Sequence, residues 1–464
     1  MNNATIVIFG ATGDLTKRKL IPSLYRLLQH NKVSNFAIIG TARDKVTVEH
    51  IMNNAKEFVQ DFDQATWDKL AQHMYYYPLD FTVASDYEKL SEQIYKVEQA
   101  HGLSGNRIVY LATAAYFFCQ ITNYVAAAKI ALRLDNTSSI WHRLVYEKPF
   151  GHDSRSAQEI NSCIAASFNE SQIYRVDHYL SKELVSNIAL VRFTNCVLEP
   201  LWNNRYIDNV QIVLSETIGV SGRGGYYDHY GALADVMQNH MLELMALIAM
   251  ESPARLTGEF IRDQRVAVLK KIKVKDALLG QYQGYTQEAD VKPDSKTETF
   301  AIACLTVDNE RWRGVPFYLK TGKMLNKKET VIHIKFKAVD CLLAKACPSD
   351  TNYLTFRIFP DSSFILTLNV KKPDTLQEVV PVNMEFSHNA LYSSATPEAY
   401  EVLFIEIMRG SQEVSVRFDE IEYAWQIIED IRKLELPVYS YRQSSSGPIE
   451  TEQFNNKHNL RWRI

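Results

Sequence analysis

The first 28 residues contain a strand, a glycine turn and a helix in direct succession. Residues 5–9 are a continuous apolar and β-branched run, and apolar residues recur at helical spacing over residues 20–28. Gly10 and Gly13 lie between them, so the turn can be tight and a ligand can approach the backbone closely. The helix that follows presents unpaired N–H groups to an anion such as a pyrophosphate. This order predicts a nucleotide-binding βαβ unit, although a Gly-x-x-Gly turn without a third glycine is weak evidence by itself.

Three consecutive cations, Lys17, Arg18 and Lys19, occupy the start of the expected helix. Cations at a helix N-terminus oppose the helix dipole, which favours a functional reason for their presence, such as binding phosphate. The alternative is a solvated basic face.

A second expected strand, residues 36–40, is followed by Arg43 and Asp44 at the position that meets the adenosine ribose in such a unit. An arginine there accepts a 2′-phosphate, whereas an acidic residue holds a free 2′-hydroxyl. Arg43 therefore favours NADP and Asp44 favours NAD. We expect NADP, with NAD as the alternative.

The alternation of strands and helices continues to a strand that ends near residue 176 and then changes character. Residues 107–112 and 144–146 are strand-like, and Lys148, held extended by Pro149, can point toward a ligand or pair with Glu147. Beyond residue 177, residues 209–214, 330–336 and 364–368 are strand-like, and the last two runs show the period-two alternation that is typical of an antiparallel sheet. We predict an α/β Rossmann-like domain over residues 1–176 and an α+β domain with a large, mainly antiparallel sheet over residues 177–464.

The stretch 175–183 brings ionisable groups of four chemical kinds together at an expected strand-to-helix turn. His178, Tyr179 and Lys182 offer a titratable donor, a phenol and an ammonium, which suit a phosphate oxygen. Asp177 is either their counter-ion or the group that orients a general base. The alternative is a solvated polar turn.

His240 lies in a long helical pattern over residues 228–250, among apolar residues. Taken alone, such a histidine is more often a hydrogen-bonded core residue than a base. The lysines at positions 320, 323, 327 and 328 form a basic cluster that, taken alone, is more often a solvated loop. The polar tail over residues 443–456 is expected to be a loosely ordered surface segment.

Composition excludes some classes of function. The net charge of −3 argues against bulk nucleic-acid binding, and no apolar run is long enough to span a membrane. The N-terminus shows no targeting segment, so a cytoplasmic location is expected. The six cysteines show no zinc-type spacing, so we expect reduced, mostly buried thiols and no metal site.

Five separated motifs resemble those of the glucose-6-phosphate dehydrogenase family, in the family's order. They are residues 10–19, 147–151, 175–183, 222–228 with 238–240, and 318–323. The resemblance spans nearly the whole chain. It implies oxidation of glucose 6-phosphate at C1 to 6-phosphogluconolactone with hydride transfer to NADP, the entry step of the pentose phosphate pathway. It also implies a homodimer or dimer of dimers formed through the sheet of the second domain.

The resemblance assigns roles to residues by motif position. It implies that His240 is the general base and that Asp177 orients it. It assigns the sugar phosphate to His178, Tyr179, Lys182 and Lys328. It assigns the sugar hydroxyls to Lys148, Glu216, Asp235 and Lys323, and the cofactor to Gly10, Gly13, Asp14, Leu15, Lys19, Arg43 and Lys148.

The chain also departs from the family's pattern. Phe359 stands where a glutamine is common, so one polar contact expected near the substrate is missing. The loop over residues 111–115 lacks the family's usual prolines, Ser181 replaces a glycine and Ser446 a tryptophan. Two alternatives therefore stay open. One is an NAD(P)-dependent dehydrogenase of another phosphosugar, and the other is a non-catalytic nucleotide sensor.

Overall fold

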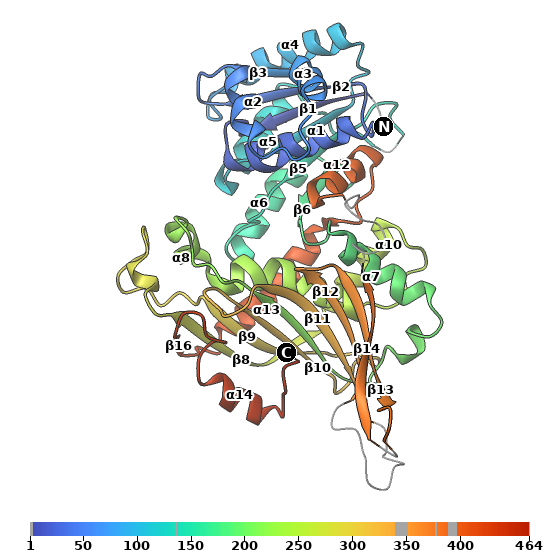
Figure 1. Cartoon of the computed structure of the whole chain (residues 1–464). Helices are drawn as coiled ribbons and strands as arrows, with labels where there is room; N and C mark the ends of the chain where they lie inside the picture. Colours follow the sequence, from blue (N-terminus) through green and yellow to red (C-terminus); the bar gives the residue numbers. More distant parts are fainter. Residues whose placement is uncertain (1–2, 136, 339–350, 376–377, 388–396, 464) are drawn as a thin grey trace. The chain divides into compact units, whose positions relative to one another are not determined.

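The computed structural model describes residues 3–135, 137–338, 351–375, 378–387 and 397–463. They form two compact units, each with its own central sheet (Figure 1). The first unit comprises Met1–Ser181, Thr257–Arg262 and Pro397–Glu422, and the second comprises Lys182–Leu256, Asp263–Thr396 and Tyr423–Ile464. The first unit is thus assembled from three stretches of the chain.

The sheet of the first unit has seven strands in the order β15-β6-β5-β4-β1-β2-β3. The six strands from β1 to β6 are parallel, and β15 pairs antiparallel with β6. Their bounds are β1 (Ala4–Phe9), β2 (Phe36–Ala42), β3 (Met74–Pro78), β4 (Arg107–Leu111), β5 (His142–Tyr146), β6 (Ile173–Val176) and β15 (Ser415–Val416). Every residue of β1 and β2 is buried, which accounts for their continuous apolar runs. The parallel arrangement confirms the Rossmann-like prediction.

Helices flank this sheet (Figure 1). They are α1 (Ile21–Gln29), α2 (Val48–Lys56), α3 (Gln64–Gln72), α4 (Ala84–His101), α5 (Phe118–Ala127), α6 (Ser154–Ser167) and α12 (Ala399–Arg409), with a π-helical turn, η1 (Thr16–Leu20), before α1. Side-chain caps begin several of them. Thr47 accepts a hydrogen bond from His50 N at 3.2 Å at the start of α2, and Asp63 accepts one from Thr66 N at 2.7 Å at the start of α3.

The sheet of the second unit has nine strands in the order β14-β13-β12-β11-β7-β10-β9-β8-β16. Among the described residues, two of its pairings, β7 with β10 and β8 with β16, are parallel, and the others are antiparallel. The bounds are β7 (Ile207–Ser215), β8 (Ile272–Tyr282), β9 (Phe300–Val307), β10 (Pro316–Gly322), β11 (Glu329–Phe336), β12 (Tyr353–Phe359), β13 (Ser363–Lys371), β14 (Val379–Ser387) and β16 (Val438–Tyr441). The predicted large, mainly antiparallel sheet is confirmed.

The helices of the second unit are α7 (Glu183–Thr194), α8 (Gly224–Ala232), the π-helix η5 (Leu233–Met241), α9 (Leu242–Ala249) and α14 (Thr451–Lys457), while α10 (Gly258–Leu269) and α13 (Phe418–Arg432) begin in the first unit and continue into the second. Every residue of α9 is buried. The indole N–H groups of Trp202 and Trp312 donate to the carbonyls of Ile248 and Ala249, both at 2.8 Å. The last carbonyl groups of a helix have no partner within the helix, and these two bonds satisfy them. They therefore hold the C-terminal end of α9, which continues from η5, in place.

Two expectations about the surface are corrected by the structure. The tail expected to be loosely ordered contains most of α14, where Phe454 is buried. Lys457, the last residue of α14, and His458, which follows it, both approach Asp276 at 2.7 Å. Of the cysteines in the described ranges, only Cys304 is buried; Cys119 and Cys163 are half-buried, Cys196 is exposed, and all four are free thiols. Cys341 and Cys347 lie outside the described residues.

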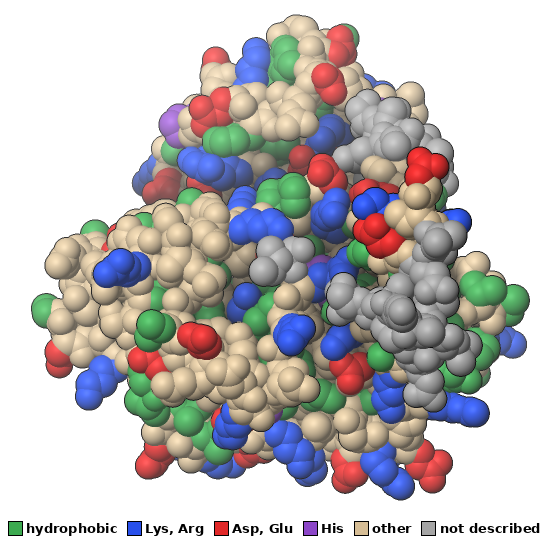
Figure 2. All heavy atoms as spheres, turned by 60° about the horizontal axis from the view of Figure 1, so that its bottom comes forward, with side chains coloured by type: hydrophobic (Ala, Val, Ile, Leu, Met, Phe, Trp, Pro, Cys, Tyr) green, Lys and Arg blue, Asp and Glu red, His purple; other side chains and the backbone are tan. Residues whose placement is uncertain are grey.

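Acidic and basic side chains are interspersed on the face drawn in Figure 2, in keeping with a net charge near zero. Among the helices that the structure describes, none has the combination of length and apolarity needed to cross a bilayer.

Candidate functional site

The glycine turn follows β1 directly. Gly10 has a φ of +96°, and a Cβ at this position would lie 2.3 Å from the carbonyl oxygen of Ala112, so no other residue fits without a shift of the backbone. The N–H of Gly13 donates to the carbonyl of Gly10 at 3.0 Å, and the Thr16 hydroxyl donates to the same oxygen at 2.9 Å. The turn is therefore tight, as the sequence predicted, and it leads at once into η1.

The cations after the turn have partners. Arg18 and Lys17 pair with the exposed carboxylate of Asp14 at 2.8 and 3.4 Å, and Lys19 pairs with Glu398 at 3.4 Å. Leu15 is half-buried at the start of η1. Ion pairs at the surface are weak, so an anionic ligand can compete with Asp14 and Glu398 for these cations.

Arg43 and Asp44 follow β2 beside the glycine turn. The carboxylate of Asp44 accepts a hydrogen bond from the Thr12 hydroxyl at 2.8 Å, and the Tyr76 hydroxyl donates to the Asp44 carbonyl. Arg43 is exposed, and none of the described residues forms an ion pair with it. The segment after β2 thus contacts the glycine turn. The Asp44 carboxylate is hydrogen-bonded there, whereas the Arg43 guanidinium has no ion-pair partner among the described residues.

Glu147 and Lys148 follow the end of β5. The Glu147 carboxyl accepts a hydrogen bond from the Tyr110 hydroxyl at 2.5 Å. Burial raises the pKa of Glu147 to about 7, although the hydrogen bonds from Tyr110 and Tyr400 and the charge of Lys148 oppose this rise. From the sequence we considered Glu147 only as a possible partner of Lys148, because no sequence pattern shows that two tyrosines enclose the carboxyl.

The polar stretch after β6 begins with a tight turn. Oδ1 of Asp177 accepts a hydrogen bond from the backbone N–H of Tyr179 at 2.8 Å, a side-chain turn typical of aspartate. The rings of His178 and Tyr179 lie 4.9 Å apart, centroid to centroid. Lys182 occupies the position before α7 in extended geometry. Asp177 and Ser181 are buried, so this stretch is not a solvated polar turn.

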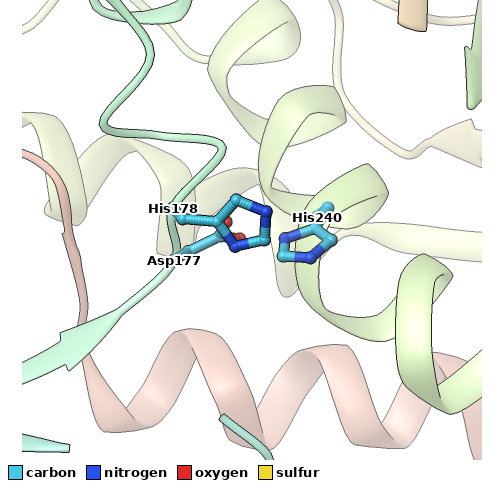
Figure 3. Close-up of side chains that lie close together, drawn as sticks. All are labelled: Asp177, His178 and His240. Atoms are coloured by element: carbon cyan, nitrogen blue, oxygen red, sulfur yellow. The ribbon is translucent and has the colours of Figure 1, made fainter. Parts of the chain in front are cut away.

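Asp177, His178 and His240 lie side by side (Figure 3). One side-chain oxygen or nitrogen from each lies within 4.8 Å of the others, and both Asp177 and His240 are 3% exposed. A carboxylate and imidazoles at this range suit proton transfer. They could also ligate a metal ion, so both readings need a test.

His240 lies in η5, whose start is held by Gly231 and Glu298. Gly231 breaks α8 with a φ of +66°, and a Cβ there would lie 2.3 Å from Oε1 of Glu298. That same oxygen accepts a hydrogen bond from the backbone N–H of Leu233 at 3.0 Å, at the first residue of η5. The Glu298 carboxylate therefore caps the π-helix that carries His240 and Asp235. π-Helical turns of this kind often occur at functional sites.

Two of the residues assigned to the sugar hydroxyls lie at the ends of neighbouring strands, and a third, Asp235, lies in η5. β7 and β10 are paired in parallel, so Glu216 and Lys323, which follow them, are adjacent and form an ion pair of 2.5 Å. The carboxylate of Asp235 accepts a hydrogen bond from the Tyr226 hydroxyl at 3.3 Å. The ammonium of Lys328 lies 4.7 Å above the centre of the Phe359 ring.

The comparisons with known proteins address the whole chain. A model described as "Glucose-6-phosphate dehydrogenase, NAD binding domain" matches residues 7–187, and one described as "Glucose-6-phosphate dehydrogenase, C-terminal domain" matches residues 189–463. The chain belongs to the glucose-6-phosphate dehydrogenase family. This confirms the resemblance drawn from the five motifs.

Relatives and solved structures agree with this membership. A glucose-6-phosphate 1-dehydrogenase of Bacillus subtilis is 38% identical, over 99% of this chain and 98% of its own. One of Chlamydia muridarum is 35% identical, over 99% and 96%. A glucose-6-phosphate dehydrogenase solved in complex with glucose 6-phosphate superposes with a TM-score of 0.92 at 32% identity, over 100% of this chain and 99% of its own.

Proposed function

We propose that the protein oxidises glucose 6-phosphate at C1 to 6-phosphogluconolactone, with NADP as the hydride acceptor. The observation that carries this proposal is the proximity of Asp177, His178 and His240, at the motif positions to which the family resemblance assigns proton transfer and phosphate binding. The relatives in the same family bear the name of this activity.

His240 acts as the general base in this proposal. An imidazole suits the role at neutral pH, and it takes the proton of the C1 hydroxyl as the C1 hydrogen leaves with its electron pair. Without this proton transfer, positive charge would build up on C1. Asp177 accepts a hydrogen bond from the other ring nitrogen, which fixes the tautomer and stabilises the imidazolium.

The substrate is held at two ends. His178, Tyr179, Lys182 and Lys328 bind the phosphate, and Lys148, Glu216, Asp235 and Lys323 bind the sugar hydroxyls. The ion pair of Glu216 with Lys323 supports this assignment, because it places an acceptor and a donor together at the ends of two strands. Phe359 supports the phosphate end, since its ring lies under the ammonium of Lys328.

NADP fits the glycine turn and the segment after β2. Gly10, Gly13, Leu15 and Lys19 border the turn, where a backbone without side chains admits a pyrophosphate. NADP held by these residues would supply its nicotinamide as the hydride acceptor. Arg43 is open to a 2′-phosphate, whereas Asp44, which would hold a free 2′-hydroxyl, is bonded to Thr12. These contacts favour NADP over NAD.

The test is a comparison of kcat/KM for NADP and NAD with glucose 6-phosphate, for the wild type, Arg43→Gln and Asp44→Asn. We expect NADP to be preferred, and Arg43→Gln to lower kcat/KM for NADP by about tenfold or more while changing that for NAD little. Asp44→Asn serves as the matched control at the neighbouring position. A wild type that prefers NAD would overturn the assignment of the cofactor.

Galactose 6-phosphate and glucosamine 6-phosphate provide the alternative substrates. Turnover of either one, with none of glucose 6-phosphate, would replace the proposed substrate by another phosphosugar. Binding of NADP without turnover of any of the three would favour the non-catalytic sensor.

A cytoplasmic location stays a prediction.

The chemistry proposed here uses no metal ion. We therefore expect dialysis against EDTA to leave the initial rate unchanged. A loss of rate that Zn²⁺ or Mn²⁺ restores would instead identify Asp177, His178 and His240 as metal ligands.

A further inference from the structure

A cavity of about 840 Å³ lies in the first unit at the amino ends of β5 and β6. Its lining includes Trp141, Arg143, Tyr174, Arg409 and Glu413. The strands β1, β4, β5 and β6 run parallel, and the glycine turn follows the carboxyl end of β1. The cavity is therefore at the opposite edge of the sheet from the nucleotide turn, and the proposed reaction does not use it.

Arg143 is fixed in place on the wall of this cavity. Its guanidinium is stacked 3.9 Å from the centre of the Trp141 ring and donates to the carbonyl of Ile407. Gly410 packs against it so closely that a Cβ there would lie 2.7 Å from Nη2. No carboxylate of the described residues forms an ion pair with Arg143, and burial lowers its pKa. A rigid, partly desolvated guanidinium without a counter-ion favours an anionic ligand.

Tyr174 adds a second, independent indication. The residue is 1% exposed, and its hydroxyl has no hydrogen-bond partner among the described residues. Buried hydroxyls in native proteins are nearly always bonded, so one that is not needs an explanation. The charges of Arg143 and Arg262 act on this hydroxyl, and burial raises the pKa of Tyr174, so the phenol stays protonated and can donate.

Most acidic groups around the cavity are already compensated. Glu170 pairs with Arg175 at 2.6 Å, and Asp135 accepts hydrogen bonds from the Thr137 hydroxyl and N–H. Burial, together with the charge of Glu406, raises the pKa of Glu413. Glu259 remains exposed at the rim. The positive charge of the lining comes from Arg143, Arg262, Arg409 and Arg417, and the charges of Arg143 and Arg262 act on the Tyr174 hydroxyl.

We propose that this cavity binds a phosphate-bearing small molecule, with the phosphate on Arg143 and Arg409 and a hydrogen bond from the Tyr174 hydroxyl. The planar fork of an arginine matches phosphate oxygens. Cavities of roughly 300–1,000 Å³ take ligands of drug or nucleotide size, and this one lies in that range. Arg409 is exposed on the last turn of α12, paired only loosely with Glu406 at 3.8 Å, so it is available to the ligand.

The test is isothermal titration of the full chain, saturated with NADP, with inorganic pyrophosphate. The proposed sugar-phosphate site is a second possible acceptor, so each cavity variant is compared with Lys182→Gln, which alters that site alone. We expect Arg143→Gln and Arg409→Gln each to weaken one binding event by about tenfold or more, an event that Lys182→Gln retains. Tyr174→Phe should weaken the same event with an unchanged melting temperature.

Arg155→Gln is the matched control, since Arg155 is a highly exposed arginine of α6 outside the cavity lining. The proposal is overturned if the only binding event is the one that Lys182→Gln removes, or if Arg143→Gln, Arg409→Gln and Tyr174→Phe all bind as the wild type does. Binding of citrate at the cavity without binding of pyrophosphate would also overturn it, because the ligand would then be a carboxylate. A folded Arg409→Gln keeps the test decisive if Arg143→Gln does not fold.

Discussion

Glu147 holds a carboxyl group that the native protein keeps protonated more readily than the unfolded chain does. Burial raises its pKa from 4.5 to about 7, and the nearby charge of Asp177 acts in the same direction. Between these two values the native state retains a proton that the unfolded state has released. The contribution of this group to stability is therefore fully present below pH 4.5 and is lost as the pH rises to about 7.

Glu147→Gln should remove this pH dependence. The amide can still accept the hydrogen bond from Tyr110 but carries no charge, so the variant should gain stability over the wild type as the pH rises from 5 to 7.5. The gain is at most roughly 3 kcal/mol, from a shift of about two and a half pKa units. Melting temperatures at the two pH values measure it. Glu159→Gln, at an exposed position of α6, should show no such difference, and an equal gain at both pH values would contradict the assignment.

His240→Asn tests the proposed base. We expect turnover to fall by roughly two to four powers of ten with little change in KM, since a general base acts mainly in the transition state. Steady-state rates with glucose 6-phosphate measure this. His30→Asn, at the exposed end of α1, is the control. Normal turnover in His240→Asn would remove this residue from the role.

For single residues, the sequence predicted chemical roles better than it predicted which side chains lie together. The residue types in 175–183 indicated a site, but the neighbours of His240 pointed to a core histidine, and only the motif resemblance linked it to Asp177. Its burial fits both readings, and its proximity to Asp177 depends on the fold. The engagement of Asp44 by Thr12, which separates the two cofactor readings, joins residues 32 positions apart and has no local signal.

At the scale of elements, turns and helices follow the local chemistry of the chain. The strand, glycine turn and helix at the N-terminus were predicted because each depends on a few adjacent residues. The helix α14 was missed because its polar composition resembles that of a loose tail, whereas Lys457 and His458 anchor it on Asp276 in β8. Composition cannot show such an anchor, because the partner is far away in the sequence.

Gly10→Ala tests the close approach at the nucleotide turn. Both Gly10 and Gly105 have a positive φ, of 96° and 87°, but only at Gly10 would a Cβ meet another atom, the Ala112 oxygen at 2.3 Å; at Gly105 nothing lies within 4 Å. Alanine at Gly105 should cost about 1 kcal/mol from backbone strain alone, and alanine at Gly10 should cost more. Melting temperatures compare the two. Equal losses would show that the contact with Ala112 relaxes freely.

At the scale of the whole molecule, β14 is an edge strand of the nine-stranded sheet and carries exposed apolar side chains. Val382, Met384 and Phe386 are 44, 63 and 38% exposed. An edge of this kind is open to pairing with another chain. This supports the homodimer that the family resemblance implies, which stays a prediction.

Met384→Lys should therefore shift the protein toward the monomer, because a charge on this strand must be desolvated in any interface that covers it. Light scattering coupled to size-exclusion chromatography measures the mass. Val197→Lys is the matched control, at a side chain that is 70% exposed outside the sheet. A dimer that persists in Met384→Lys would place the interface elsewhere.

The two-part organisation was predictable from the length and from the change in strand pattern, but the composition of the first unit was not. No local sequence pattern indicates that residues 257–262 and 397–422 belong to the unit that begins at the N-terminus. Such long-range membership depends on pairings like that of β15 with β6 and on ion pairs of Arg26 with Glu398 and Glu401, at 2.8 and 2.9 Å.

This membership has a consequence for biosynthesis. A ribosome that has released residues 1–181 has delivered the nucleotide turn and six parallel strands, yet the edge of β6 stays open until Ser415 and Val416 emerge. Unpaired strand edges attract non-native partners while a chain is being made. The nascent chain must therefore shield this edge through the synthesis of more than two hundred further residues, and its demand for chaperones should be greatest in that interval.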